Sequence, residues 1–391
     1  MNRLEGSIQA YAWGQLGAIA TFLGSAPSGR PEAELWLGAH PAAPSRLGPT
    51  GRSLRDVIAE APTPTLGPAV AARFGELPFL LKLLAADTPL SIQAHPSKAQ
   101  AERGFADEEA RQVPLATRNY KDANHKPELL VALGPFEALC GFRDAEESAA
   151  LFDELGLVAL ARDLRTSGNK AVFERLLRQE GAASLVAEAR AAAERAIAAG
   201  SAFQRTLEWT LELSRLYPAD AGCITALLLN YVALEAGEGL YLPAGNLHAY
   251  LRGFGVEIMA SSDNVLRGGL TPKHVDVDEL LRVVDFDAAK VLPLRATVSG
   301  DSEVAWSTPA ADFHLSRLTV DGTLRREPRG PEILLAESGT MTLAPASGGV
   351  GENRRDLTLQ QGDAAFVAHD DGPYSLQGSG SLFRATVGDL S

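Results

Sequence analysis

Short strand-like runs bounded by glycine, proline and aspartate fill most of the chain, and one helix-forming interval interrupts them. Examples of such runs are "ELWLGAH" (34–40), "PFLLKLLA" (78–85) and "EILLAES" (332–338). Between about 144 and 217, by contrast, segments such as "AASLVAEARAAAERAIAAG" consist of strong helix formers and end at glycine. This alternation predicts a mainly β protein with an α-helical insertion.

A stretch punctuated by glycine and proline narrows the β architecture. Gly237, Pro243, Gly245 and His248 follow one another at the spacing seen in small double-sheet barrels of the cupin type. A similar stretch begins at Gly362, and its later positions hold Ala368, Asp370 and Pro373. We therefore predict two cupin-like jelly-roll barrels, of which the second is degenerate, together with a helical domain.

Changes in residue pattern along the chain set the expected domain boundaries. Residues 1–143 and 218–290 are expected to form the first cupin domain, which would carry the functional site. Residues 144–217 are the helical insertion, which opens with Asp144 and Glu147 at the spacing of a capping box. Residues 291–391 are expected to form a C-terminal cupin-like domain without metal.

The stretch "SIQAHP" at 91–96 is strand-like but carries a polar side chain at every second position. Ser91, Gln93 and His95 would share one face of a strand. Such a face is either a solvated outer surface or a group of polar side chains that converge inside a barrel. The rest of the sequence has to distinguish these two interpretations.

A carboxylate and a second imidazole could complete such an interior site. Glu128 stands two residues after Lys126, so both face one way if the segment is extended, as the proline between them favours. The alternative is an ordinary pair on a solvated strand edge. His248 lies in the turn described above. With Gln93 and His95, these residues offer an amide oxygen, two imidazoles and a carboxylate, which suit zinc with an open position, although manganese or iron is not excluded.

Length, charge and cysteine content restrict the class of protein. The 391 residues are expected to form two or three domains, at roughly 100–200 residues each. A formal net charge of −13 argues against nucleic acid or an anionic membrane as the main partner. The two cysteines, Cys140 and Cys223, are far apart and suggest neither a disulfide framework nor a thiolate zinc site. Because the sequence has no long apolar run, we expect a cytoplasmic protein.

Taken together, the motifs resemble the type I, zinc-dependent mannose-6-phosphate isomerases (phosphomannose isomerases) of the cupin superfamily. The matching segments occur in the family's order from near the start of the chain to about residue 285. They are "QAYAWG" (9–14), "ELWLGAHPAAPS" (34–45), "PFLLKLLAADTPLSIQAHP" (78–96), "NHKPELL" (124–130), "YLPAGNLHAYL" (241–251) and "SSDNVLRGGLTPKH" (261–274).

The resemblance implies one zinc ion per chain and assigns roles to particular residues. It implies Arg267 as the catalytic residue. The departures are small: Leu247 stands where many members have proline, and Ala39 where others have a polar residue. The zinc ligands would be Gln93, His95, Glu128 and His248. The substrate contacts would be Ser91, Lys126, Lys273, Asp263, Glu257 and Tyr250.

The implied reaction interconverts D-mannose 6-phosphate and D-fructose 6-phosphate through a cis-enediol intermediate. A divalent metal near O1 and O2 would stabilise the developing negative charge, and an arginine at position 267 suits an oxyanion or a phosphate. The base that removes the C2 proton stays open among Glu257, Asp263, Lys126 and Lys273. His40 is a candidate for opening the pyranose ring, and the alternative is an ordinary loop histidine.

Two other functions remain open. One is a non-catalytic bicupin sensor that binds a sugar phosphate to control a partner. The other is an iron oxygenase with a facial site of two histidines and one carboxylate, which a fourth ligand at Gln93 and the cations near Arg267 disfavour. The expected partner is a small-molecule sugar phosphate, with no nucleic acid and no membrane, and the default expectation for the assembly is a monomer.

Overall fold

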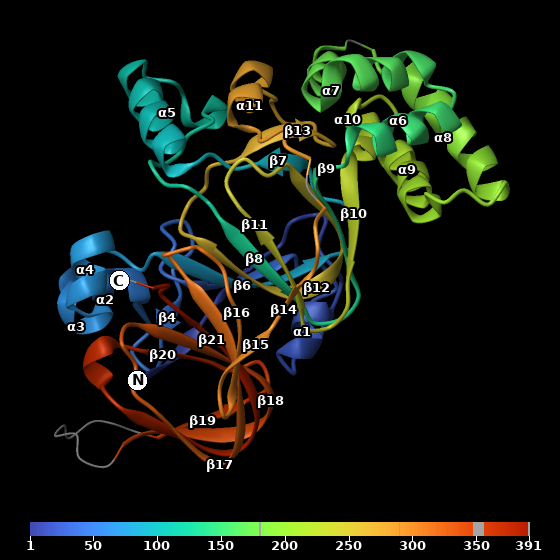
Figure 1. Cartoon of the computed structure of the whole chain (residues 1–391). Helices are drawn as coiled ribbons and strands as arrows, with labels where there is room; N and C mark the ends of the chain where they lie inside the picture. Colours follow the sequence, from blue (N-terminus) through green and yellow to red (C-terminus); the bar gives the residue numbers. More distant parts are fainter. Residues whose placement is uncertain (180, 289, 347–355, 390–391) are drawn as a thin grey trace.

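The computed structural model describes residues 1–179, 181–288, 290–346 and 356–389. Strands dominate, and the helices gather mainly in one part of the molecule, so the prediction of a mainly β protein with helices is confirmed (Figure 1). None of the helices in these residues is long and apolar enough to cross a membrane.

The first sheet is built around one long strand, β12 (His248–Ala260). The second half of β12 pairs with β6 (Phe79–Ala86) and β8 (Glu128–Ala132). The strand order continues outward to β11 (Glu238–Leu242) and β14 (Leu294–Arg295) on one side, and to β3 (Glu34–Gly38) and β2 (Ser7–Gln9) on the other.

The first half of β12 belongs to a second layer of the same barrel. It pairs with β7 (Ile92–Ala94) and β9 (Phe136–Phe142), while β13 (Leu266–Gly269) pairs with β7 and β10 (Leu229–Leu234) pairs with β9. The pairing register shifts between Tyr250 and Arg252, just before Gly253 with its φ of 148°. A strand that passes from one layer to the other needs such an irregularity in its pairing. Glycine is required at position 253 because a side chain there would collide with Phe136.

The other sheet contains the C-terminal strands and the N-terminal strand. Its order is β15 (Thr297–Gly300), β16 (Glu303–Trp306), β17 (His314–Arg326), β21 (Tyr374–Thr386), β18 (Glu332–Pro345), β20 (Ala364–Val367), β1 (Asn2–Glu5), β4 (Arg46–Leu47) and β5 (Arg52–Ser53), with β19 (Leu357–Gln360) beside β18. The core between the two sheets is apolar, with Phe79, Leu81, Val256, Phe366 and Phe383 among its buried side chains.

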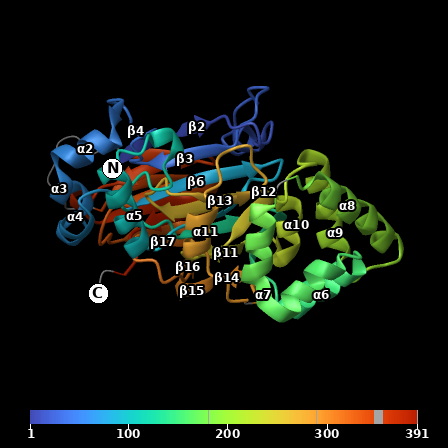
Figure 2. The same cartoon turned by 90° about the horizontal axis from the view of Figure 1, so that it is seen from above.

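The interval predicted to be helical forms a helical cluster. Its helices are α6 (Ala145–Glu154), α7 (Val158–Arg178), α8 (Ala183–Ala198) and α9 (Gln204–Leu216). Asp144 caps α6 by accepting from the backbone N–H groups of Glu146 and Glu147. In both views these helices lie on the side of the molecule opposite α2 (Leu54–Glu60), α3 (Pro62–Leu66) and α4 (Pro68–Phe74) (Figures 1 and 2).

Shorter helices cover the remaining surfaces. They are α1 (Ala18–Phe22), α5 (Lys98–Ala110), η1 (Leu115–Thr117), α10 (Gly222–Thr225), η2 (Ala226–Leu228), α11 (Val277–Val283) and η3 (His369–Asp371). Figure 2 shows α5 and α11 above the strands of the first barrel. Both helices therefore lie on the side where the polar residues of "SIQAHP" are found.

Candidate metal centre

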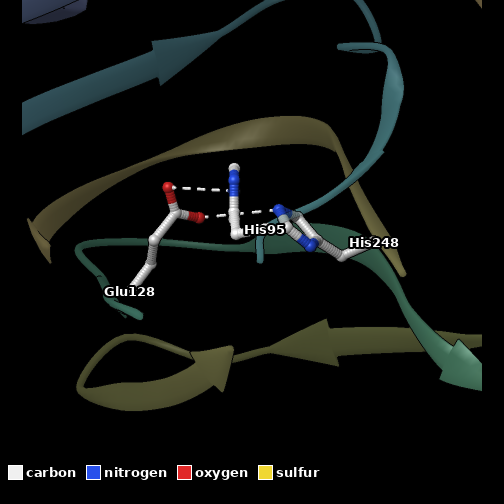
Figure 3. A group of neighbouring side chains, drawn as sticks. All are labelled: His95, Glu128 and His248. Atoms are coloured by element: carbon white, nitrogen blue, oxygen red, sulfur yellow. Dashed lines mark ion pairs between the residues drawn. The ribbon is translucent and has the colours of Figure 1, made fainter. Parts of the chain in front are cut away.

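His95, Glu128 and His248 converge inside the first barrel, although they come from three separate segments. His95 directly follows β7, Glu128 opens β8 and His248 opens β12. One ligand atom from each lies within 4.8 Å of the others. All three side chains are buried, at 1%, 2% and 0% exposure respectively. Figure 3 shows the two rings and the carboxylate directed toward one another.

Hydrogen bonds on the outer side of each ring fix which nitrogen faces the centre. Nδ1 of His95 lies 2.7 Å from the backbone carbonyl of Asn264, and Nδ1 of His248 lies 3.0 Å from that of Asn246. A carbonyl oxygen only accepts, so both Nδ1 atoms carry the proton and donate it. The Nε2 lone pairs are therefore turned toward Glu128, at 3.4 Å from Oε1 for His95 and 3.5 Å from Oε2 for His248.

The atoms that face the centre lack partners. Nε2 of His95, Nε2 of His248 and Oε2 of Glu128 are buried and have no hydrogen-bond partner among the described residues. Leaving buried polar atoms unpaired is costly, at ~1–3 kcal/mol for each group. Lone pairs aimed at one point are the expected arrangement for ligands of a cation. The donor set of two imidazoles and a carboxylate therefore fits a divalent metal, zinc included.

The electrostatics of these residues agree with a metal site. Burial lowers the pKa of His95 to about 4, so its ring is neutral and able to ligate near pH 7. Burial raises the pKa of Glu128, but Lys126 and the imidazoles outweigh it and bring that pKa well below the usual value. Nζ of Lys126 lies 3.0 Å from Oε1 of Glu128, which leaves Oε2 for the centre. Lys126, a predicted substrate contact, is thus in direct contact with a ligand.

The predicted fourth ligand, Gln93, lies beside His248. Gln93 is directly opposite His248 in the pairing of β7 with β12, and directly opposite Arg267 in the pairing of β7 with β13. Side chains that are directly opposite on neighbouring strands share a face of the sheet. Gln93, His248 and Arg267 therefore form a row across three strands, which brings the predicted catalytic arginine next to the metal centre.

Arg267 is half-buried on β13, and burial lowers its pKa. Lys273 is exposed after the same strand, and burial together with the charges of Arg267 and Lys121 lowers its pKa. The effect of Arg267 and Lys121 on Lys273 indicates that both cations lie near it. Ser91, the remaining residue considered for the phosphate, is half-buried immediately before β7.

Asn264 organises the loop beside the centre. Its buried amide accepts from the N–H groups of Lys121 and Asp122 at 2.7 and 3.3 Å. It donates to the carbonyls of Asp122 and Asn124 at 2.7 and 2.8 Å. The backbone carbonyl of Asn264 is the group that orients His95. One residue thus couples the 121–124 loop, which leads into Lys126 and Glu128, to a ligand.

His40 and Asp263 form a pair near the cations. Nδ1 of His40 accepts from the N–H of Ala42 at 3.2 Å, so its Nε2 carries the proton and faces Oδ1 of Asp263 at 3.4 Å. The hydrogen bond from His40 lowers the pKa of Asp263. His40 is buried, whereas the Asp263 side chain is 46% exposed. Two residues singled out from the sequence therefore act on each other directly.

Glu257 and Tyr250 belong to a buried charged network that the sequence prediction did not include in full. Oε2 of Glu257 lies 2.9 Å from Nζ of Lys82, and Oε1 accepts from the Tyr250 hydroxyl at 2.9 Å. Lys82 also pairs with Glu34 at 3.6 Å. Burial alone would lower the pKa of Lys82, but Glu257 and Glu34 raise it above its usual value. The network holds both carboxylates in fixed positions.

Lys82, Glu34 and Asn264 were missed as site residues, and one of them left a signal in the sequence. Lys82 is the single charge within "FLLKLLAA", and every residue of that strand is buried. A lysine in such a strand needs a buried partner, which predicts a charged network. Asn264, by contrast, has no signal that distinguishes it from an ordinary loop asparagine.

Comparisons with known proteins agree with this geometry. A family model described as phosphomannose isomerase type I, catalytic domain, matches residues 1–145. The mannose-6-phosphate isomerase of Escherichia coli (strain K12) is 40% identical, over 98% of this chain and 99% of its own. That of Homo sapiens is 31% identical, over 94% and 93% respectively.

Solved structures are similar over the whole length. A crystal structure of mannose 6-phosphate isomerase bound with zinc and yttrium has a TM-score of 0.90 and 37% identity, covering 100% of both chains. The apo form of mannose 6-phosphate isomerase from Salmonella typhimurium has a TM-score of 0.89 and 37% identity, covering 100% of this chain and 99% of its own.

Proposed function

This chain belongs to the family of type I mannose-6-phosphate isomerases, and from that premise we propose that it interconverts D-mannose 6-phosphate and D-fructose 6-phosphate. The observation that carries the proposal is the convergence of His95, Glu128 and His248, with their unpartnered buried atoms facing one point. A sensor could bind both the metal and the sugar phosphate, and the relatives that this chain matches over its whole length are named as isomerases.

The metal held at this centre is zinc, with Gln93, His95, Glu128 and His248 as its ligands. When bound, zinc supplies a Lewis acid that stabilises negative charge developing on O1 and O2 of the sugar. The row of Gln93, His248 and Arg267 across β7, β12 and β13 supports the fourth ligand. It also supports a role for Arg267, whose fixed donor fork suits the same developing charge.

The exposed cations beside β13, Lys273 and Lys121, bind the phosphate group of the substrate. Burial and the neighbouring charges of Arg267 and Lys121 lower the pKa of Lys273, and a bound dianion would relieve that repulsion. Lys121 lies on the loop that Asn264 holds. Ser91 is placed before β7 and adds a hydroxyl. This arrangement fixes the sugar at its phosphate end and leaves the aldose end for the metal.

The proton transfers are assigned to the pair of His40 and Asp263. His40 holds the carboxylate of Asp263 in place and lowers its pKa, so Asp263 is ionised near neutral pH, as a base must be. The contacts of two other candidates argue against them: Glu257 is buried between Lys82 and Tyr250, and the ammonium group of Lys126 is taken by Glu128. In this assignment Asp263 holds the transferred proton, and His40 assists opening of the ring.

The finer description of the fold is part of this proposal. The catalytic cupin domain comprises residues 1–143 and 218–290, and residues 144–217 form the helical insertion. Residues 291–391 form a cupin-like domain without metal. Of this last domain, residues 347–355 and 390–391 lie outside the described residues. The two layers that β12 connects support a jelly roll in the first domain. Strand β1 departs from this division of the chain: it lies in the range of the first domain but pairs with β20 of the C-terminal domain. A cytoplasmic monomer that binds neither nucleic acid nor membrane is the setting we propose.

A coupled assay on mannose 6-phosphate tests the function. Activity of the purified protein should fall by at least ~100-fold after chelation, the usual loss when a charge-stabilising group is removed, and should return with zinc. The activity of His248→Ala should not return when zinc is added. A matched control is His369→Ala, since His369 lies in η3 of the other domain.

The outcomes separate the alternatives. Turnover that survives complete removal of metal contradicts the metal-dependent isomerase. Saturable binding of mannose 6-phosphate without turnover in zinc-loaded protein would instead indicate the sensor.

A further inference from the structure

A cavity of about 430 Å³ lies away from the metal centre, where the helical cluster meets the first barrel. Its walls come from the start of α6, the start of α9 and strand β10, which lie together in Figure 1. None of the proposed metal ligands or substrate contacts lines it. The residues that concern its chemistry are Arg143, Asp144, Glu147, Arg205, Tyr231 and Lys290.

Arg143 forms part of the cavity wall and is a buried cation without a buried anion. Its exposure is 7%, and no carboxylate forms an ion pair with it among the described parts of the chain. Nη2 donates to the Thr206 hydroxyl at 3.3 Å and to the Leu229 carbonyl at 3.1 Å, and the guanidinium lies 5.4 Å from the centre of the Phe203 ring. Nε is buried without a partner in the same described residues. Burying a cation in this way costs several kcal/mol unless an anion compensates it.

The other charges around the cavity do not neutralise Arg143. Asp144 is occupied as the N-cap of α6, and Arg205 is paired with Glu137 and Glu208. Lys290 adds a second positive charge to the wall, and the exposed Glu147 opposes it. Burial lowers the pKa of Arg143, and the charge of Glu147 only partly offsets this effect. The wall thus carries charges of both signs, but Arg143 itself has no ion-pair partner among the described residues and keeps an unpaired Nε.

We propose that this cavity is a second anion-binding site, separate from the catalytic centre, which takes the phosphate or carboxylate group of a small metabolite against Arg143. A guanidinium is the side chain best suited to such groups, because its planar donors match two oxygens of the anion. The Tyr231 hydroxyl and Lys290 line the same space. The volume is sufficient for a small organic anion and too small for a macromolecular segment.

Calorimetric titration of the zinc-loaded protein tests the proposal, with inorganic phosphate and succinate as separate probes. The wild type should bind phosphate at two sites, since the catalytic phosphate contacts also take it. Arg143→Met should weaken one of these by at least ~10-fold, the usual effect of losing a charge-assisted hydrogen bond. Lys273→Met should weaken the other and leave the cavity unchanged. If succinate binds the wild type, and Arg143→Met no longer binds it, the site also accepts carboxylates.

A second variant decides the question even if Arg143→Met does not fold. Glu147→Gln removes the opposing exposed charge and should tighten binding in the cavity by roughly two- to fivefold, the size of a surface charge interaction. The proposal is overturned if Arg143→Met binds phosphate and succinate with the affinities of the wild type. It is also overturned if Glu147→Gln binds neither phosphate nor succinate more tightly than the wild type does. Both variants should keep isomerase activity, so a failure here is distinct from a failure of the proposed function.

Discussion

At the scale of single residues, the pairing of Gln93 with both His248 and Arg267 has the largest consequence. It places a charged donor and the metal centre on one face of the barrel, with one residue between them. The guanidinium can then act on the charge that the metal also stabilises. The two contributions should be separable, because Arg267 is not itself a metal ligand.

Arg267→Ala separates them. We expect kcat to fall by ~10²–10³-fold, as for the loss of an oxyanion-stabilising donor, while zinc content and Tm stay near those of the wild type. Steady-state kinetics and metal analysis check this. Arg282→Ala is the matched control, because Arg282 is an arginine of α11 whose side chain is 71% exposed. Near-normal turnover of Arg267→Ala would contradict the role of Arg267.

The convergence of His95, Glu128 and His248 could be predicted because strands impose a period of two and prolines restrict the backbone. Gln93 and His95 are two residues apart, and so are Lys126 and Glu128. On an extended strand this spacing places both members of each pair on the same face. The hydrogen bonds that orient the rings could not be predicted. They come from backbone carbonyls of Asn264 and Asn246, and a backbone carbonyl has no signature in the sequence.

At the scale of elements, helix α5 packs tightly on the loop beside the site. A Cβ atom at Gly104, inside α5, would lie 2.2 Å from Cε2 of Tyr120. Tyr120 is 2% exposed, and its hydroxyl donates to Glu279 of α11 at 2.5 Å. The glycine is therefore required by the close approach of the aromatic ring, and through it α5 is fixed relative to α11.

Gly104→Ala should accordingly destabilise the protein, although alanine favours helix by about 1 kcal/mol over glycine. Overpacking typically costs ~1–3 kcal/mol, so we expect a lower Tm and weaker protection of the Tyr120 loop. Thermal unfolding measures the first and hydrogen exchange the second. Glu102→Ala on the exposed face of α5 is the control. A Tm above that of the wild type would show that the ring moves away freely.

The C-terminal sheet contains a charged cluster whose contribution to the stability of the fold depends on pH. Glu303 of β16 pairs with Arg326 of β17 and Arg384 of β21. Burial raises the pKa of Glu303, but Ser316 and these arginines outweigh it, so the pKa is lowered overall. A carboxyl with a lowered folded pKa stabilises the fold above its unfolded pKa of about 4.5 and loses that contribution as the pH falls through the folded value.

Glu303→Gln tests this linkage. The variant should be less stable than the wild type at pH 6, and its Tm should decrease less as the pH is lowered from 6 to 3. Calorimetry over this pH range measures both slopes, and Glu327→Gln, at a neighbouring surface position, is the control. Parallel curves for Glu303→Gln and the wild type would exclude Glu303 as a source of acid sensitivity.

Some elements differ from the sequence prediction because long-range pairing decided them. The segments 78–85 and 90–96 suggest two strands joined by a tight turn, but the second strand, β7, covers only Ile92–Ala94. The two strands do not pair with each other, and each pairs with a different half of β12. Thr271 and Pro272 favour a helix start at that point, but α11 begins only at Val277, where Asp276 caps it. The apolar run "CITALLLNYVAL" from 223 suggests a strand, but it opens as a helix and becomes a strand only at Leu229. Local propensity does not specify these partners.

At the scale of the whole molecule, the metal centre ties together segments that are distant in the chain. The three residues that converge there are His95, Glu128 and His248, which come from both layers of the first barrel. A metal that binds the folded protein alone stabilises it, by about 2.7 kcal/mol when free metal is a hundredfold above Kd. The stabilisation should therefore extend to the entire barrel.

Scanning calorimetry with and without zinc checks this expectation. The transition of the first barrel should move to higher temperature with zinc in the wild type and stay in place in His248→Ala. His369→Ala should behave as the wild type. If zinc leaves the wild-type Tm unchanged, the convergent histidines do not hold the metal in solution.

Strand β1 has a consequence for how the protein is made. Asn2 pairs with Phe366 and Arg3 with Ala365, so β1 joins a sheet whose C-terminal strands are synthesised much later than β1 and its other neighbour, β4. Until β20 emerges, β1 has an unpaired edge, and such edges favour association with other chains. Nascent chains stalled before residue 364 should thus depend on chaperones far more than the released protein does.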